Sequence, residues 1–345
     1  MDFGGGDDIR FERSGRAGVV TLSRPKSLNA LTRPMVQALA TALAAWEDDP
    51  SVAMVLVKAE GRAFCAGGDI TQVYEARRRG QPAPVAFFAE EYRLNAHIQR
   101  YRKPYLALID GIVMGGGVGI SFHGSHRILT EKAQFAMPEV GIGFFPDVGG
   151  SHILAPLGPY GMYLALTGNR IGPGDALGSG LATHTIPATQ QDALTSALIE
   201  SGDPETTLAA FSSPVARETD SSALAAIDTH FSKPSLEAVV ESLAMASDEF
   251  SAQTLATIRS RSPTSLAVTF RQIRMAQGLS MAECMNMEFR ILNRMLAGHD
   301  FYEGIRAAIV DKDRQPKWRP AELSEVKAAD VDAYFAPLGK QELGL

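Results

Sequence analysis

Two apolar segments of the chain are each followed by a cluster of glycines, and this arrangement limits the possible folds more than any other feature. Residues 52–57 lead into "AFCAGGDI", and residues 105–109 lead into "GIVMGGGVGISF". Continuous apolar runs of this length are typical of strands buried on both faces of a sheet. Glycine after such a strand lets the backbone approach a ligand closely and leaves N–H groups pointing outward. Either cluster alone fits a tight turn, but the two together favour an oxyanion hole, in which N–H groups from two turns bind one carbonyl oxygen.

Strand and helix patterns alternate along the first part of the chain. Residues 9–13 and 18–22 predict two short strands around a turn, and the apolar spacing of residues 35–46 predicts a helix. Such alternation is typical of an α/β domain with parallel strand pairing. After about residue 202 the patterns are helical only. The sequence therefore predicts a core domain over residues 9–200 and a helical C-terminal region over residues 201–345.

Two features of the C-terminal region carry further predictions. Ser262 followed by Pro263 predicts a helix start, because proline is favoured in the first turn of a helix. A later segment carries several methionines, which fit a helix packed in the core or at a subunit interface better than a cofactor site. These methionines are Met281, Met285, Met287 and Met295.

Composition and charge exclude several classes of function. The chain has 345 residues, is 45% hydrophobic and carries a net charge of −6, so nothing indicates binding to nucleic acid or to an anionic membrane. The basic run at residues 77–79 fits a solvated helix end, or contacts to the phosphates of a small ligand. Two cysteines, Cys65 and Cys284, cannot form a disulfide framework, which favours a reducing cytoplasm. No apolar run approaches the roughly 20 residues that span a bilayer.

Several catalytic motifs are absent from the sequence. It contains neither a GxxxxGK[ST] phosphate loop nor a GxSxG nucleophile elbow. His123 and His126 stand close together in "HGSH", but a zinc site needs three or four ligands, so we predict no metal site. Cys65 could be a nucleophile, yet no histidine lies near it in the sequence. A small buried hydrophobic residue is the better interpretation.

Two isolated acids interrupt the apolar stretch "FAMPEVGIGFFPDVGG". Glu139 and Asp147 each follow a proline directly. Burying a charge is costly unless the charge is paired or its pKa shifts. One interpretation is that both acids cap turns at the surface. The other is that both face a pocket, where they perform acid–base chemistry on a substrate.

The motifs "RPKSLNAL", "AFCAGGDI", "GIVMGGGVG" and "FAMPEVGIGFFPDVGG", in this order, resemble the crotonase (enoyl-CoA hydratase/isomerase) superfamily. The stretches "FFAEEY", "SPTSL" and "GHDFYEGIRAAIVDKDRQPKW" extend the resemblance over nearly the whole chain, to the 3-hydroxyisobutyryl-CoA hydrolases of valine breakdown. This resemblance implies a crotonase-like spiral of ββα units followed by a helical C-terminal region. It also implies a homo-oligomer of the trimer or hexamer type.

The resemblance also assigns catalytic roles to residues of this chain. The glycine before the Asp of "GGD" and the middle glycine of "GGG" provide the oxyanion N–H groups in the superfamily, and these match Gly68 and Gly116. The second glutamate of hydratases matches Glu139, and the additional aspartate of the hydrolases matches Asp147. Hydratases usually carry another catalytic glutamate where this chain has Gly119. The two-glutamate hydratase mechanism therefore cannot be assembled in the usual way.

Binding residues follow from the same resemblance. Substrate contacts are expected from a further acid of the "EEY" motif, together with the catalytic set: Glu91, Gly116, Glu139 and Asp147. CoA is expected along the first two motifs, at Lys26, Leu28, Ala66, Gly68, Asp69 and Ile70. CoA would arrive as part of the substrate, so no separate cofactor is expected.

The resemblance therefore implies an acyl-CoA thioester hydrolase that converts 3-hydroxyisobutyryl-CoA to 3-hydroxyisobutyrate and CoA. Two alternatives stay open. One is an enoyl-CoA hydratase or isomerase of the same superfamily, since isomerases can use a single carboxylate. The other is a crotonase-like binding protein without activity, which the complete set of glycines and acids disfavours. Thiol release measured against loss of enoyl absorbance would separate the three.

Overall fold

The computed structural model describes all residues, 1–345, and divides them into two compact units. Unit 1 contains residues 1–69, 90–135 and 171–218, and unit 2 contains residues 70–89, 136–170 and 219–345. Each unit is therefore built from three separate pieces of chain. These units do not coincide with the predicted ranges 9–200 and 201–345, because residues 70–89 and 136–170 of the predicted core pack with the C-terminal helices.

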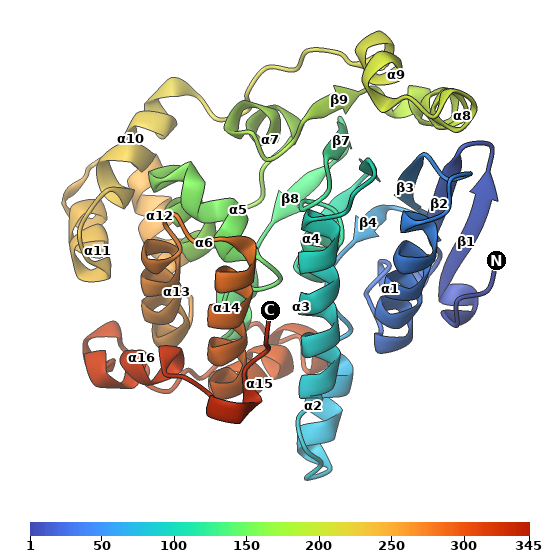
Figure 1. Ribbon diagram of the computed structural model, residues 1–345. Coiled ribbons are helices and arrows are strands. Elements are labelled where there is room, and N and C mark those ends of the chain that lie inside the picture. Colours follow the sequence, from blue (N-terminus) through green and yellow to red (C-terminus); the bar gives the residue numbers. More distant parts are fainter. The chain divides into compact units, whose positions relative to one another are not determined.

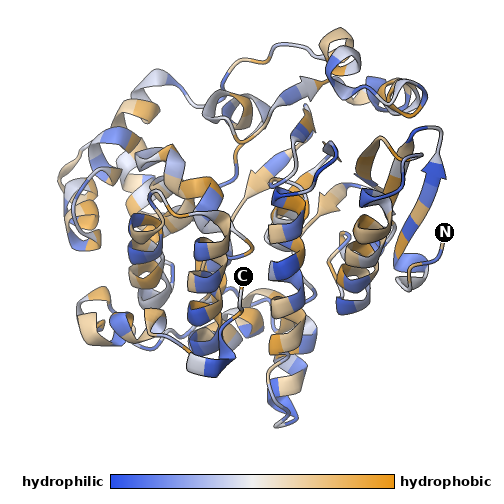
Figure 2. Ribbon diagram, viewed as in Figure 1, coloured by the Kyte–Doolittle hydropathy of each residue, from blue (hydrophilic) through white to orange (hydrophobic).

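Unit 1 is built on a six-stranded sheet of order β1-β2-β3-β5-β7-β9 (Figure 1). β1 and β2 pair antiparallel around a turn, as predicted, and β2, β3, β5, β7 and β9 then pair parallel in chain order. β1 alternates hydrophobic and hydrophilic residues, which marks it as a strand with one buried face (Figure 2). The strands are β1 (Ile9–Ser14), β2 (Ala17–Leu22), β3 (Met54–Ala59), β5 (Tyr105–Ile109), β7 (His126–Thr130) and β9 (His184–Ile186).

A second sheet explains the spiral topology. Its strands β4 (Ala63–Cys65), β6 (Ile112–Met114) and β8 (Gln134–Ala136) each follow a strand of the large sheet after a short connection. Successive turns of the chain thus add one strand to each sheet before the next helix begins. This is the ββα spiral that the family resemblance implies.

Both faces of the large sheet are covered by helices of unit 1. One face packs against α8 (Gln191–Ser201) and α9 (Pro204–Phe211), where Leu56, Leu106 and Ile128 meet Leu198 in one hydrophobic cluster. On β2, a β carbon at Gly18 would lie 2.5 Å from the ring of Trp46, so Gly18 allows α1 (Arg33–Glu47) to pack closely there. The remaining helices of this unit are α4 (Gly116–Gly119) and α7 (Pro173–Ser179).

Unit 2 is helical. Its central helix α6 (Pro159–Thr167) is buried from residue 161 onward, as expected for a helix that is apolar on all sides. It contacts α10 (Ser221–Phe231), α12 (Glu249–Arg259) and α13 (Pro263–Met275). The other helices are α2 (Thr71–Arg78), α5 (Gly150–Leu154), α11 (Leu236–Met245), α14 (Met281–Met295), α15 (Asp300–Ile305) and α16 (Ala328–Phe335); α3 (Val85–Gln99) begins in unit 2 and continues into unit 1.

Local sequence signals place several of these helices. α13 begins at Pro263, and the Ser262 side chain accepts a hydrogen bond from the Ser265 N–H, as the Ser-Pro pair predicts. α14 begins with a capping box between Ser280 and Glu283. All four methionines predicted as core or interface lie buried on α14 within unit 2. None of the helices is both long and apolar enough to cross a membrane.

Truncation of a buried methionine should be far more destabilising than truncation of an exposed one. Met285 is 0% exposed on α14, whereas Met275, at the end of α13, is 44% exposed. We expect Met285→Ala to lower the free energy of unfolding by about 2–5 kcal/mol, because it leaves a cavity. The matched control Met275→Ala should change it by no more than about 0.5 kcal/mol. Urea unfolding of both variants measures the difference, and equal effects would contradict the described packing of α14.

Candidate active site

The two glycine clusters come together in unit 1. Gly68 follows β4, and Gly116 is the first residue of α4, directly after β6. Because β4 and β6 are parallel neighbours, their C-terminal ends meet at the same edge of the small sheet. A β carbon added to Gly116 would lie 3.2 Å from the backbone nitrogen of Gly68 and 2.6 Å from Oε1 of Glu91 on α3. Three of the predicted site residues are therefore adjacent.

The N–H groups of both glycines are available to a ligand. Leu31 forms a parallel bridge with Gly68: its N–H donates to the Gly67 carbonyl, and its carbonyl accepts the Asp69 N–H. In this pattern the Gly68 N–H points away from Leu31. Gly116 begins a helix, where the first N–H groups have no partner within the helix. Neither N–H group makes a hydrogen bond within the chain, which is the arrangement that an oxyanion hole requires.

Packing beneath α4 depends on further glycines. A β carbon at Gly117 would lie 2.2 Å from the carbonyl oxygen of Cys65, so no other residue fits there without movement of the backbone. Gly119, at the end of the same helix, is buried and offers no carboxylate. Cys65 itself is fully buried, and burial raises the pKa of its thiol to about 12. Its complete burial agrees with its interpretation as a core residue.

The loop with the sequence "RPKSLNAL" is fixed by residues that the sequence analysis did not single out. The buried Asn29 side chain donates to the carbonyl oxygens of Glu60 and Ala63, at 2.8 Å each. Its own oxygen accepts the Arg24 N–H. The Arg24 guanidinium in turn lies 3.3 Å from the Asp69 carboxylate. These contacts join the loop to the chain around the "CAGGDI" motif.

The residues predicted to bind CoA largely follow this loop. The Leu28 carbonyl accepts the Ala66 N–H at 3.0 Å, which brings these two residues together beside Gly68 and Asp69. Lys26 is exposed in the short 3-10 helix Pro25–Ser27 of the same loop. Ile70 is the first residue of unit 2 and precedes α2.

The two predicted acids lie buried in unit 2, so they do not cap turns at the surface. Glu139 begins the 3-10 helix Glu139–Ile142, which ends at Gly143. The segment then packs tightly, because a β carbon at Gly143 would lie 2.3 Å from the Asp300 carbonyl oxygen. The ring of Phe144 stacks on that of Phe301 with centroids 4.3 Å apart. Helix α15 thus supports the apolar turn between the two acids.

The buried acids influence each other electrostatically. Burial raises the pKa of Glu139 well above its usual value, and the charges of Asp147 and Glu288 add to this effect. Oε2 of Glu139 is buried and has no hydrogen-bond partner in the chain. Most buried polar atoms are hydrogen-bonded, so an exception in such a cluster points to a chemical role.

Glu288 on α14 is a member of this cluster that sequence reasoning missed. Its carboxylate accepts the N–H groups of Gly149 and Ser151 at 2.7 and 2.9 Å. Burial nevertheless raises its pKa to about 8, against the lowering effect of hydrogen bonds from this turn. One signal could have identified it. Glu288 stands three and four residues after Met285 and Cys284, so it falls on the apolar face of its helix.

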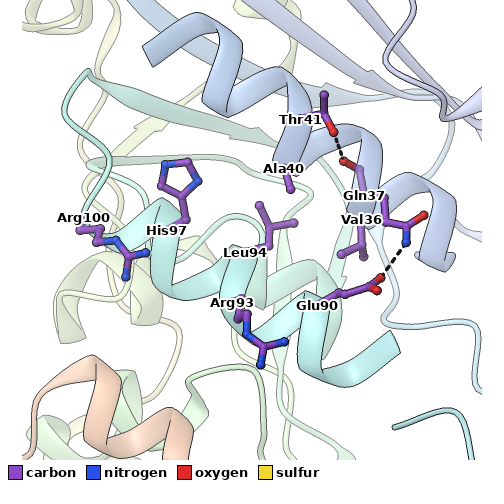
Figure 3. Close-up of a pocket in the computed structure, with 9 residues that line it drawn as sticks. All are labelled: Val36, Gln37, Ala40, Thr41, Glu90, Arg93, Leu94, His97 and Arg100. Carbon is purple, nitrogen blue, oxygen red and sulfur yellow. Dashed lines mark hydrogen bonds between the residues drawn. The ribbon is translucent and has the colours of Figure 1, made fainter. Parts of the chain in front are cut away.

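A groove of about 500 Å³ lies elsewhere in unit 1, between α1 and α3 (Figure 3). Gln37 on α1 donates to Glu90 on α3 across it, and Arg33 forms a bidentate ion pair with the same carboxylate. None of the predicted site residues lines this groove. In the whole chain, no group of three or more His, Cys, Asp or Glu side chains is arranged to hold a metal ion.

The chain is similar to known proteins along nearly its whole length. Residues 17–335 match the family model described as enoyl-CoA hydratase/isomerase. The chain belongs to this family. A zebrafish (Danio rerio) protein named "3-hydroxyisobutyryl-CoA hydrolase, mitochondrial" is 43% identical, over 99% of this chain and 92% of its own length. The resemblance to the hydrolase members of the family is thereby confirmed.

Solved structures of family members confirm the crotonase fold. A structure titled carnitinyl-CoA dehydratase, from Mycobacterium thermoresistibile, is 41% identical with a TM-score of 0.93, and the match covers 98% of both chains. Another, titled enoyl-CoA hydratase, from Rhodobacter sphaeroides 2.4.1, is 39% identical with a TM-score of 0.88, covering 98% of this chain and 100% of that one. The names of these family members thus describe different reactions on CoA thioesters.

A side chain at Gly116 should block the proposed oxyanion site. In Gly116→Ala the new methyl group would lie 3.2 Å from the Gly68 nitrogen, where a carbonyl oxygen has to approach. We expect turnover to fall by about 100- to 1000-fold, the usual effect of losing an oxyanion donor. Steady-state thiol release measures this, with circular dichroism as the test of folding. A folded variant with wild-type turnover would show that Gly116 does not bind the reacting carbonyl.

Proposed function

We propose that the chain hydrolyses 3-hydroxyisobutyryl-CoA to 3-hydroxyisobutyrate and CoA. The name of the zebrafish relative supports this substrate. The observation in the structure that carries the proposal is Glu139, a buried carboxylate with a raised pKa and an oxygen that has no hydrogen-bond partner. Such a group is suited to take a proton from water or to attack a carbonyl carbon.

In the proposed reaction, the N–H groups of Gly68 and Gly116 bind the thioester oxygen as negative charge develops on it. Their adjacency within unit 1 supports this role. The donors are part of the folded backbone and need no reorganisation during the reaction, which is what makes such stabilisation effective. We assign the loop from Lys26 to Leu28, together with Ala66, Asp69 and Ile70, to CoA, and Glu91 to the acyl group.

Glu139 would start the chemistry by one of two routes. As a general base it takes a proton from water, and the hydroxide adds to the carbonyl carbon. As a nucleophile it forms an anhydride, which water then opens. In the base route the C–S bond breaks as the proton held by Glu139 passes to the departing thiolate. In the anhydride route the thiolate departs first and takes up a proton that is released when water opens the anhydride. In both routes the thioester and one water give the carboxylate, the CoA thiol and one proton, which is released to solvent. Asp147 would bind the 3-hydroxyl group and assist the proton transfer.

Hydration or dehydration is the second candidate, because both solved structures named above carry such titles. Gly119 argues against it. The position where the resemblance places the first hydratase glutamate is a buried glycine at the end of α4, with no group that could hold a proton. A single carboxylate is sufficient for hydrolysis or isomerisation, but not for the two-glutamate route.

Removal of the carboxylate charge at position 139 should separate these functions. We expect Glu139→Gln to lower thiol release from 3-hydroxyisobutyryl-CoA by about 100- to 10,000-fold, the range for loss of a general base. CoA binding should persist, because Glu139 is assigned to the acyl end.

Asp147→Asn should lower turnover, and it should also lower the preference for 3-hydroxyacyl over plain acyl thioesters. Thiol release measured for the wild type, Glu139→Gln and Asp147→Asn tests both expectations. A wild type that hydrates crotonyl-CoA and releases no thiol would refute the assignment of hydrolase activity.

The pH profile gives an independent test of Glu139. Its pKa is raised and the reaction needs the ionised form, so activity should increase as pH rises through this elevated pKa. The Asp147 charge contributes to raising it, so Asp147→Asn should move the acid limb of kcat/KM to lower pH. The exposed Glu283→Gln, a control on α14, should leave the limb in place. An acid limb at the ordinary carboxyl pKa in wild type would show that buried Glu139 is not the titrating group.

Three further properties belong to this proposal. No separate cofactor takes part, since CoA enters with the substrate, and activity should therefore survive dialysis against a chelator. The chain forms a homo-oligomer, a trimer or hexamer, as the family resemblance implies. It works in the cytoplasm, which its two free cysteines are compatible with, whereas the zebrafish relative is named as mitochondrial. Neither the oligomer nor the location affects the assignment of the reaction.

A further inference from the structure

The turn that carries Asp147 is held from one side by α14. Glu288 is fully buried on this helix, and its two carboxylate oxygens accept one N–H group each, from Gly149 and from Ser151. Gly149 and Ser151 belong to the segment that begins just after Asp147 and Val148. A buried carboxylate is a costly group to place in a helix interface, but it satisfies two backbone donors at once.

The same turn is held from a second helix. On α13, the buried Gln272 side chain donates through Nε2 to the Pro146 carbonyl and to Oγ of Ser151, at 2.7 Å each. Residues 146–151 are therefore fixed before and after Asp147 by two polar side chains of the C-terminal region. We call Glu288 and Gln272 the turn clamp.

The turn has a backbone conformation that needs such support. Val148 adopts a left-handed conformation with φ of 51°, and Gly149 follows with φ of 83°. For a β-branched residue this region is an outlier, and strained residues persist only where the surroundings hold them. Val148 is the direct neighbour of Asp147. A turn that relaxed out of this conformation would carry the Asp147 side chain with it.

We infer that Glu288 is a positioning residue for the proposed hydrolysis, holding the strained turn so that Asp147 is aimed at the 3-hydroxyl group of the acyl chain. The inference rests on the proposed function for the role of Asp147, whereas the clamp itself rests on the hydrogen bonds of Glu288. The helical C-terminal region thereby takes part in substrate choice, besides completing a core.

Glu288→Gln is the sharpest test, because it keeps the size of the side chain. It replaces one acceptor oxygen by an NH2 group, which cannot accept the N–H that it faces. The control is Glu283→Gln, an exposed site on the same helix whose capping box also tolerates glutamine. The main readout is the ratio of kcat/KM for 3-hydroxyisobutyryl-CoA to kcat/KM for isobutyryl-CoA.

The ratio should fall by about 10- to 100-fold in Glu288→Gln, since misplacement of a substrate-orienting group by about 1 Å can cost up to ~100-fold. It should not change in Glu283→Gln. A purely structural role would reduce the folded fraction, which lowers both rates equally and leaves the ratio unchanged. An unchanged ratio in the folded Glu288→Gln variant would therefore overturn the inference, even if both rates drop.

A second measurement does not depend on activity. Deuterium uptake by a peptide covering residues 146–151 should rise in Glu288→Gln and not in Glu283→Gln, because the Gly149 or Ser151 amide loses its acceptor. If wild type releases no thiol, the proposed function fails, and this uptake alone decides whether the clamp exists. If Glu288→Gln does not fold, Gln272→Met replaces it, with Gln277→Met as the control. The readouts are again the kcat/KM ratio and the deuterium uptake of residues 146–151. Unchanged uptake overturns the clamp.

Discussion

The contact between Cys65 and Gly117 sets the geometry on which the glycine turns depend. The Cys65 carbonyl occupies space that a β carbon at position 117 would need, so α4 can begin directly against β4 only with glycine there. β4 and β6 are parallel neighbours, and their last residues lead into the two turns at one sheet edge. Gly68 and Gly116 consequently lie next to each other, so that a β carbon at Gly116 would be 3.2 Å from the Gly68 nitrogen. The ββα spiral, which alternates strands between two sheets, is what makes β4 and β6 neighbours.

In unit 1 the constraint is close backbone packing at glycine. In unit 2 it is a set of acids that the core must accommodate. Each buried carboxylate costs roughly several kcal/mol if it stays charged without partners. Glu288 offsets this with two backbone N–H donors, whereas Glu139 keeps an oxygen with no partner. The same environment thus leaves one carboxylate engaged with the backbone, and the other, to which we assign the reaction, with an oxygen that has no partner. This division of roles is typical of sites in which neighbouring carboxylates do different work.

Much of the fold could be predicted from local patterns. The strand at Tyr105–Ile109 and the helix start at Pro263 agree with the structure because each depends on neighbouring residues. The adjacency of Gly68, Gly116 and Glu91 followed from a resemblance rather than from periodicity. The hydrogen bonds of Glu288 to the turn could be predicted neither from local patterns nor from the resemblance. Its partners lie far back in the chain, and an acid on an apolar helix face gives no indication of which backbone donors it will meet.

Local sequence patterns also could not predict the division of the chain into two units. A change from alternating to purely helical patterns marks a change in secondary structure, and the helices after β9 do follow that change. It does not mark a boundary in packing. Residues 136–170, which the patterns place within the spiral, pack with helices that come much later, because α6 is apolar on all sides and needs α10, α12 and α13 around it.

The interleaving of the units has a consequence for how the chain can be made. The chain passes from one unit to the other after Asp69, Ala89, Phe135, Arg170 and Glu218. On a ribosome, unit 1 has all its residues once Glu218 has emerged, whereas unit 2, begun at Ile70, waits for the C-terminal helices. Until then α6 lacks α10, α12 and α13 for part of its apolar surface, and the strained turn at Val148 lacks the helices that hold it. A nascent chain of this kind therefore keeps part of the apolar surface of α6 uncovered from the synthesis of Thr167 until α13 is complete at Met275.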